Sequence, residues 1–154
     1  MKQLEAFGIK TQFIRKDTTT YNNRVTNTPK GEVSTPYVGN VEKQTMQNKD
    51  YRNTLFTGKH SQLVLMNIKP RQSIGNEVHP KVDQFFRIES GDAEFTLNNK
   101  QKIREGPGGA VIVPGGHYHN VTNPSKTRDL KLYTIYSPSN HPPNTRQKTR
   151  PKND

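Results

Sequence analysis

Two histidines one residue apart follow an apolar run and a turn. The run at 110–113 meets a Pro-Gly-Gly sequence, and His117 and His119 come directly after it. This pattern predicts a strand that ends in a turn and a second strand that begins at the histidines. Side chains alternate faces along a strand, so we expect His117 and His119 to point the same way. Neutral imidazoles are common metal ligands, so metal chemistry is the first candidate.

A second group of polar side chains lies upstream. Glu77 and His79 share one face of a short predicted strand, and Gln84 opens the next apolar strand after a break at Pro80. Two imidazoles, one carboxylate and one amide on three short strands converge only if the sheet curls. A small β-barrel would bring them together.

The remaining pattern supports a barrel. Short apolar or alternating runs are separated by turn residues, and helical periodicity is almost absent. We expect strands at 61–69, 76–79, 84–89, 93–97, 101–104, 110–113, from 117 onward, and at 130–136. Asn98 and Asn99 tolerate positive φ and suit a hairpin turn. The two faces of the last strand are both substantially apolar, so the pattern does not decide which of them points inward.

One spacing resembles a known family. The run Gly108-x5-Pro114-x-Gly116-x2-His119-x3-Asn123 is similar to the second sequence motif of the cupin superfamily at every defining position. The wider stretch of about 52–142 resembles small single-domain cupins of the mannose-6-phosphate isomerase-like group. This resemblance implies an all-β fold, a double-stranded β-helix or jelly-roll barrel.

The first cupin motif is similar but altered. Glu77 stands at the position of its first histidine and His79 at that of its second, while Gln84 replaces the glutamate and Gly91 matches the glycine. The candidate metal ligands are therefore Glu77, His79, Gln84 and His119, with Gln84 a weak neutral ligand or a hydrogen-bonding group. Two imidazoles and one carboxylate suit manganese, iron, nickel or zinc. The opposing interpretation is a metal-free pocket whose polar groups satisfy one another.

The resemblance implies a small metal-binding cupin that acts on or senses a small polar metabolite such as a sugar. No serine or cysteine nucleophile motif, phosphate loop or paired-carboxylate site is visible, so an enzyme here would use metal-assisted isomerisation, epimerisation or oxygen chemistry. His117 is the candidate catalytic acid or base, or else an exposed loop histidine. The alternative function is a non-catalytic binding module with a vestigial pocket. We assign His60 and His141 to structural or surface roles.

Composition narrows the protein class. The 154-residue chain is 28% hydrophobic and has no cysteine, which excludes disulfides and thiolate zinc sites. No apolar run approaches the ~18 residues of a membrane span, so we expect no membrane contact. We expect an intracellular, cytoplasmic protein.

The net charge is +11. A basic surface attracts anions and nucleic acid without specificity, but no aromatic-and-basic reading motif accompanies this charge. We expect at most non-specific contact through basic ends. A homodimer would help such a small barrel to bury its apolar faces.

Three regions follow from these patterns. We expect a polar, basic arm at 1–52, with a short helix near 41–51 capped by Asn40, then the barrel at 53–139 and a basic tail at 140–154. The stretch at 16–40 and the tail are too polar to bury much surface, so we expect both to be disordered or loosely packed. The first 15 residues form either a strand that adds to a barrel edge or a frayed terminus.

Overall fold

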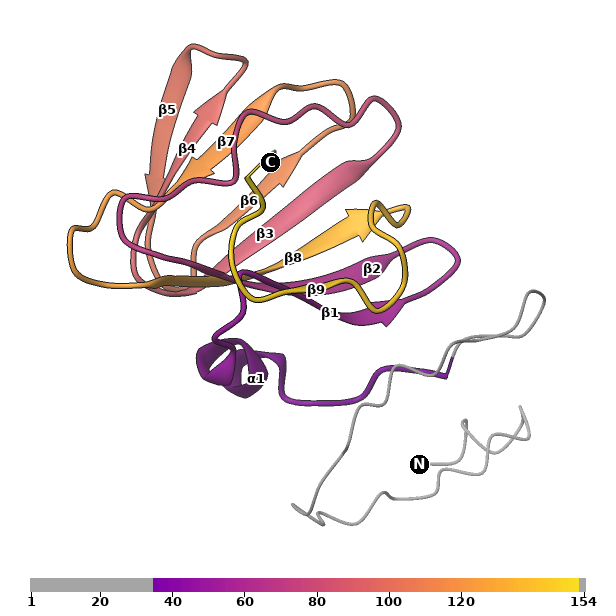
Figure 1. Cartoon of the computed structure of the whole chain (residues 1–154). Helices are drawn as coiled ribbons and strands as arrows, with labels where there is room; N and C mark the ends of the chain where they lie inside the picture. Colours follow the sequence, from indigo (N-terminus) through magenta and orange to yellow (C-terminus); the bar gives the residue numbers. More distant parts are fainter. Residues whose placement is uncertain (1–34, 153–154) are drawn as a thin grey trace, which may run out of the picture.

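The chain forms a barrel of antiparallel strands with one short helix. The computed structural model describes residues 35–152 (Figure 1). The helix is α1 (Val41–Gln47). The strands are β1 (Arg52–Thr57), β2 (Gln62–Ile68), β3 (Asp83–Ser90), β4 (Ala93–Leu97), β5 (Gln101–Glu105), β6 (Ala110–Val113), β7 (His119–Thr122), β8 (Leu130–Ser137) and β9 (Arg146–Gln147). The all-β prediction is confirmed. The sequence analysis missed β1 as a full strand and β9 altogether, and the strand predicted at 76–79 is wrong because only an isolated bridge forms there, at Glu77.

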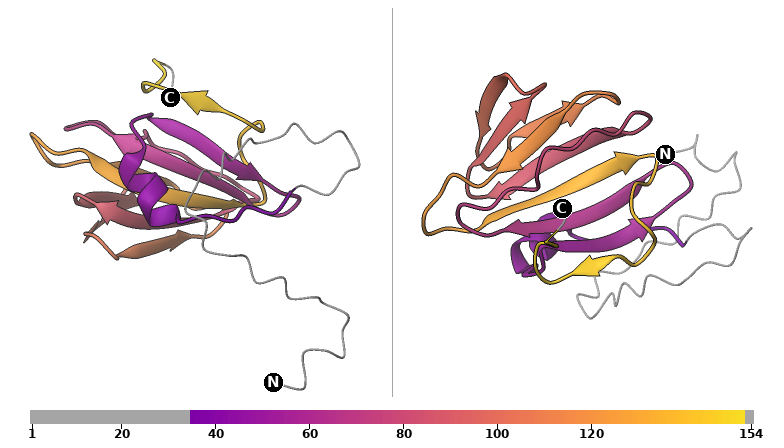
Figure 2. Two further views of the ribbon diagram at one scale, coloured as in Figure 1. Left: turned by 90° about the horizontal axis from the view of Figure 1, so that it is seen from below. Right: turned by 45° about the horizontal axis from the view of Figure 1, so that its top comes forward.

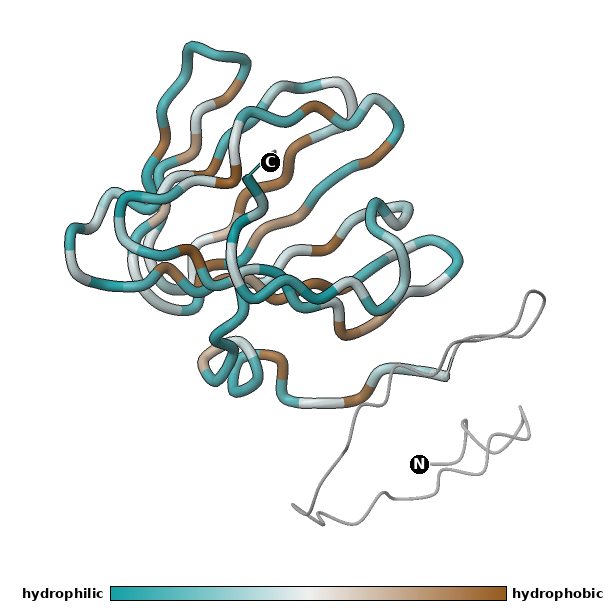
Figure 3. Tube along the Cα trace, in the orientation of Figure 1, coloured by the Kyte–Doolittle hydropathy of each residue, from teal (hydrophilic) through white to brown (hydrophobic). Residues whose placement is uncertain are grey.

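Two sheets enclose one core. The larger sheet has the order β6-β3-β8-β2-β1-β9 and the smaller β5-β4-β7. Apart from the consecutive pairs β1–β2 and β4–β5, neighbouring strands come from distant parts of the sequence. Apolar side chains from both sheets meet between them; the rings of Phe86 on β3 and Phe95 on β4 lie 5.3 Å apart, edge to face. Figure 3 shows hydrophobic stretches concentrated on the strands and hydrophilic ones on the loops. This is the jelly-roll arrangement that the sequence predicts.

The register of the larger sheet decides which faces point inward. On β8, alternate residues are buried, from Leu130 to Tyr136. On β3 the buried residues are Gln84, Phe86 and Ile88, which line up with this face of β8. The face of β8 that carries Leu130 and Tyr136 therefore points inward, and the face that carries Tyr133 points outward.

Tight turns connect the strands of the smaller sheet. Gly91 has φ +81°, and a Cβ there would lie 2.7 Å from the carbonyl oxygen of Asp129, so the turn before β4 requires glycine. Asn98 and Asn99 both adopt positive φ in the hairpin between β4 and β5. The hairpin predicted at these two asparagines is confirmed.

Helix α1 packs on the outer face of the larger sheet. Asn40 is its N-cap and accepts a hydrogen bond from the Lys43 N–H, as the sequence predicts. The helix ends at Gln47 rather than near 51, because Asn48, Asp50 and Tyr51 leave it to form the approach to β1.

The C-terminal segment is ordered, so the prediction of a disordered tail at 140–154 is wrong for residues up to 152. Strand β9 pairs with β1, and the Thr54 N–H donates to the carbonyl of Thr145. Figure 2 shows the segment returning along the sheet to lie beside β1. The polar composition of the segment suggested disorder, but a polar segment can still pair through its backbone with an existing sheet edge, which needs no apolar side chains.

Two further predictions concern the N-terminal arm and contact with membranes. The arm that the sequence predicts at 1–52 lies outside the described residues as far as residue 34. Within 35–152, no helix is long and apolar enough to cross a membrane.

Candidate metal centre

Glu77, His79 and His119 come together at one end of the barrel, and we call them the triad. The backbones of Glu77 and His119 pair directly: each N–H donates to the other's carbonyl, over 2.8 and 2.9 Å. The Gly116 N–H donates to the His79 carbonyl over 3.0 Å, which ties the turn before β7 to the segment before β3. Backbone hydrogen bonds thus fix all three triad residues.

The donor atoms of the triad face one another. One ligand atom from each residue lies within 4.8 Å of the other two. The His79 Nε2 and Glu77 Oε2 atoms are 3.3 Å apart, and His119 Nε2 is 3.9 Å from the same carboxylate oxygen. The His119 side chain is only 1% exposed, so it belongs to the barrel interior, while Glu77 and His79 are half-buried.

Gln84 extends this cluster from β3. Its Oε1 atom lies 2.9 Å from His119 Nε2, and its amide nitrogen donates to the Thr134 hydroxyl over 3.0 Å. The other ring nitrogen of His119, Nδ1, lies 3.1 Å from the His117 carbonyl. A neutral imidazole has one N–H, so two oxygen atoms compete for a single proton.

This arrangement fits a metal ion. With the proton on Nδ1, where it donates to the His117 carbonyl, the Nε2 lone pair of His119 is available as a ligand. Gln84 Oε1 lies 2.9 Å from His119 Nε2, so an ion held by His119 would have this amide oxygen beside it. The donor set of two imidazoles and a carboxylate suits a first-row divalent cation.

Burial supports the neutral form of His119. Removal from water lowers the pKa of this imidazole below its ordinary value, while its hydrogen bond to the His117 carbonyl and the charge of Glu77 oppose that shift. The neutral form is the one that binds metals.

Comparison with known proteins identifies the family. A family model described as a cupin domain matches residues 64–136. Protein L612 of Acanthamoeba polyphaga mimivirus is 44% identical over 121 residues, which cover 75% of this chain and 74% of L612. The chain belongs to the cupin superfamily.

Two further proteins match most of the chain. YrkC of Bacillus subtilis is 42% identical over 122 residues, which cover 75% of this chain and 64% of YrkC. The crystal structure of BH2720 from Bacillus halodurans is 38% identical and superposes with a TM-score of 0.72, covering 75% of this chain and 91% of BH2720. L612 and YrkC are both named as uncharacterized proteins, so their names indicate no activity for this cupin.

His117 differs from its neighbour in this cupin. Strand β7 begins at His119, so His117 lies in the preceding turn and is exposed. The prediction that both imidazoles share one strand face is therefore wrong, because alternation holds only within a strand. Among residues 35–152, no hydrogen bond, ion pair or ring contact holds its imidazole, whereas its backbone carbonyl lies 3.1 Å from His119 Nδ1.

The sequence analysis missed one histidine near the triad. His141, assigned there to a structural or surface role, is half-buried and lies against Tyr136, with its Nε2 3.2 Å from the Tyr136 hydroxyl. The ring of Tyr136 in turn lies 5.9 Å from that of His79. His141 follows the two cupin motifs by many residues, so no motif spacing could have pointed to it, whereas His60 is exposed as expected.

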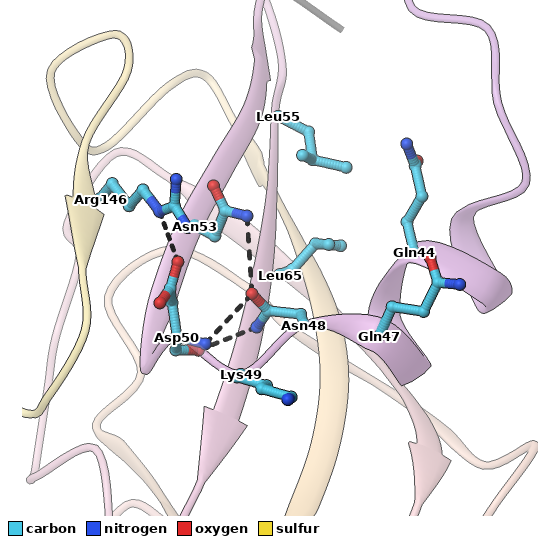
Figure 4. A pocket seen from close by; sticks show the side chains of 9 residues that line it. All are labelled: Gln44, Gln47, Asn48, Lys49, Asp50, Asn53, Leu55, Leu65 and Arg146. Carbon is cyan, nitrogen blue, oxygen red and sulfur yellow. Dashed lines mark hydrogen bonds and ion pairs between the residues drawn. The ribbon is translucent and has the colours of Figure 1, made fainter. Parts of the chain in front are cut away.

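A separate pocket lies on the outer side of the larger sheet. It has a volume of about 350 Å³ and is built from α1, β1 and the C-terminal segment (Figure 4). Asp50 and Arg146 form an ion pair at its edge, and Asn48 hydrogen-bonds the Asp50 backbone. None of the triad lines this pocket.

Proposed function

We propose that this cupin binds a divalent metal ion through Glu77, His79 and His119. The observation that carries the proposal is the convergence of three ligand atoms within 4.8 Å of one another. In this proposal Gln84 completes the metal shell or contacts the ligand, since its amide oxygen lies beside His119 Nε2. Manganese, iron, nickel and zinc all suit this donor set.

The proposed ligand is a small polar metabolite, of which a sugar is one example. A three-residue donor set leaves metal positions open to oxygen atoms of such a molecule, and a bound cation supplies Lewis-acid chemistry there. The reactions in keeping with this site are isomerisation, epimerisation and oxygen chemistry. His117 is the proposed acid or base, at the exposed rim. Membership of the mannose-6-phosphate isomerase-like group belongs to the same proposal.

Metal content by mass spectrometry tests the site. Protein purified without an affinity tag is compared with His79→Ala and His119→Ala, and His60→Ala is the control because His60 is exposed and far from the cupin motifs. We expect near-stoichiometric metal in the parent and control and none in the two triad variants. Absence of metal from the parent, even after reconstitution with all four metals, would overturn the proposal.

The second candidate is a non-catalytic binding module, and one observation favours it. The Gln84 amide nitrogen donates to Thr134 and its oxygen lies 2.9 Å from His119 Nε2, so these buried polar groups have partners within the protein itself. A parent protein that remains folded and metal-free through reconstitution would support this function in place of the first.

Three further predictions from the sequence remain open. A homodimer is consistent with the exposed edge strand β6, on which the Ile112 side chain is 67% exposed. Light scattering tests the dimer, because a monomeric mass would exclude it. Non-specific contact of the basic ends with nucleic acid and a cytoplasmic location also stay predictions.

A further inference from the structure

Three polar side chains lie side by side on the inner face of the larger sheet. The register aligns Gln62 on β2 with Tyr136 on β8, and Tyr136 with Gln84 on β3. All three are almost completely buried. Buried polar groups need hydrogen-bond partners, so the partners of this row show what it holds in place.

Gln62 holds the segment that follows β8. Its Oε1 accepts hydrogen bonds from the backbone N–H groups of Asn140 and His141, over 3.1 and 2.9 Å. Its amide nitrogen donates to the carbonyl of His141 over 2.8 Å. The backbone of His141 is thus bound on both sides by one buried amide, which fixes where its imidazole points.

The result is a fixed contact between two rings. His141 meets Tyr136 edge to face at 5.1 Å between ring centroids, with Nε2 3.2 Å from the hydroxyl. On its other side, the Tyr136 ring meets His79 of the triad at 5.9 Å. Tyr136 therefore lies between the C-terminal segment and the metal centre.

The Tyr136 hydroxyl keeps its proton. The ordinary pKa of a phenol is about 10, so the hydroxyl is protonated at neutral pH without any shift. A protonated phenol is a hydrogen-bond donor, and donors bind anionic acceptors about twice as strongly as neutral ones.

We propose that Tyr136 binds the ligand of the metal centre by donating its hydroxyl proton to an anionic oxygen or nitrogen atom, and that His141 positions this hydroxyl. The inference rests on the proposed function, because it concerns the ligand that occupies the open metal positions. It narrows that ligand to one that presents a negatively charged donor atom beside the triad. His141 acts through Tyr136 and is a positioning residue.

Azide binding to the cobalt(II)-loaded protein tests this inference. Azide is a small anion that takes open positions on cobalt and changes its visible spectrum. The variants are Tyr136→Phe, His141→Leu, His141→Gln and the double variant Tyr136→Phe/His141→Leu. Tyr133→Phe is the matched control, since Tyr133 lies on the same strand but faces outward, against Phe85.

We expect cobalt affinity to stay within about threefold of the parent in every variant. Azide affinity should fall about tenfold in Tyr136→Phe, the loss of one charge-assisted hydrogen bond, and about threefold in His141→Leu. In the proposed arrangement His141 donates its Nε2–H to the phenol oxygen, which leaves the O–H proton for the ligand. His141→Gln should recover part of that loss, because its amide nitrogen can donate to the same oxygen. The double variant should bind azide no more weakly than Tyr136→Phe alone, since His141 acts only through that hydroxyl.

The possible failures are distinguishable. A parent that binds no cobalt overturns the proposed function and this inference together. Normal cobalt binding with unchanged azide affinity in Tyr136→Phe overturns the inference alone. Effects that multiply in the double variant would show that His141 acts independently of Tyr136, and would overturn its positioning role.

Discussion

The two ends of the barrel interior are equally buried but chemically opposite. At one end, Met66, Leu132 and Ile88 lie side by side on β2, β8 and β3. At the other end of the same three strands, the row consists of Gln62, Tyr136 and Gln84. Each of the six side chains is at most 1% exposed.

Burial therefore does not separate the core from the site in this protein. The apolar row is stabilised by removal of its surface from water and by close packing, neither of which is directional. The polar row is stable only because its amides have partners: Gln62 binds the segment at 140–141, and Gln84 binds Thr134 and His119. Changes at the two ends should consequently have different signatures.

The largest expected effect on stability lies at the apolar end. Leu132→Ala leaves a cavity between the sheets and should lower the free energy of unfolding by about 2–5 kcal/mol, measured by urea denaturation. Ile135→Ala on the same strand is the control, since Ile135 is half-buried on the outer face. If Leu132→Ala lowered the free energy of unfolding no more than Ile135→Ala does, the apolar end would not be tightly packed.

Gln84→Glu should add a second negative charge at the polar end and destabilise the metal-free protein. The new carboxylate would be buried near Glu77, which should cost roughly 1–3 kcal/mol of unfolding free energy in the metal-free protein. Because a cation offsets this repulsion, added manganese or zinc should restore the loss. Denaturation with and without metal measures both effects.

Gln62→Glu is the matched control for that experiment, because Gln62 lies in the same buried row but contacts the C-terminal segment. We expect it to be destabilised without rescue by metal. Equal rescue of both variants, or of neither, would contradict a metal position beside Gln84.

Gln62→Leu should detach the C-terminal segment from the polar end. The backbone N–H groups of Asn140 and His141 would lose their acceptor, at a cost of about 1–2 kcal/mol. Amide hydrogen exchange should accelerate at 140–147, while the apolar end stays protected. Gln72→Leu is the control, because Gln72 is exposed, and it should change neither the unfolding free energy nor the exchange rate at 140–147. Unaltered exchange in Gln62→Leu would show that β9 alone holds the segment.

The smallest expected effect is a pH dependence of the metal-free protein. The folded-state pKa of His119 lies below its ordinary value of 6.5, so the unfolded chain takes up its proton first as the pH falls. His119 should thus reduce stability as the pH drops below about 6.5, down to its folded pKa. The difference between the urea midpoints at pH 7.5 and 5.5 should be smaller in His119→Gln than in the parent. An identical difference in the two proteins would exclude protonation of His119 as its cause.

Much of the fold could be read from the sequence alone. Apolar runs, alternation and turn residues predicted most of the strands, and the hairpin at Asn98 and Asn99 is formed as expected. These features are local: strand alternation and turn chemistry depend on residues close in the chain. The spacing of the second cupin motif likewise led to His119, and the altered first motif to Glu77 and His79, which the structure brings together.

Other features were decided only by tertiary contacts. The C-terminal segment is held in place by the edge of β1 and by the buried amide of Gln62, both of which are far away in the sequence. The inward face of β8 was ambiguous until its register with β3 was known, and His141 reaches Tyr136 only through this packing. A sequence specifies local geometry through backbone and side-chain preferences, whereas the partners of a polar segment are chosen by the surfaces that the folded barrel presents to it.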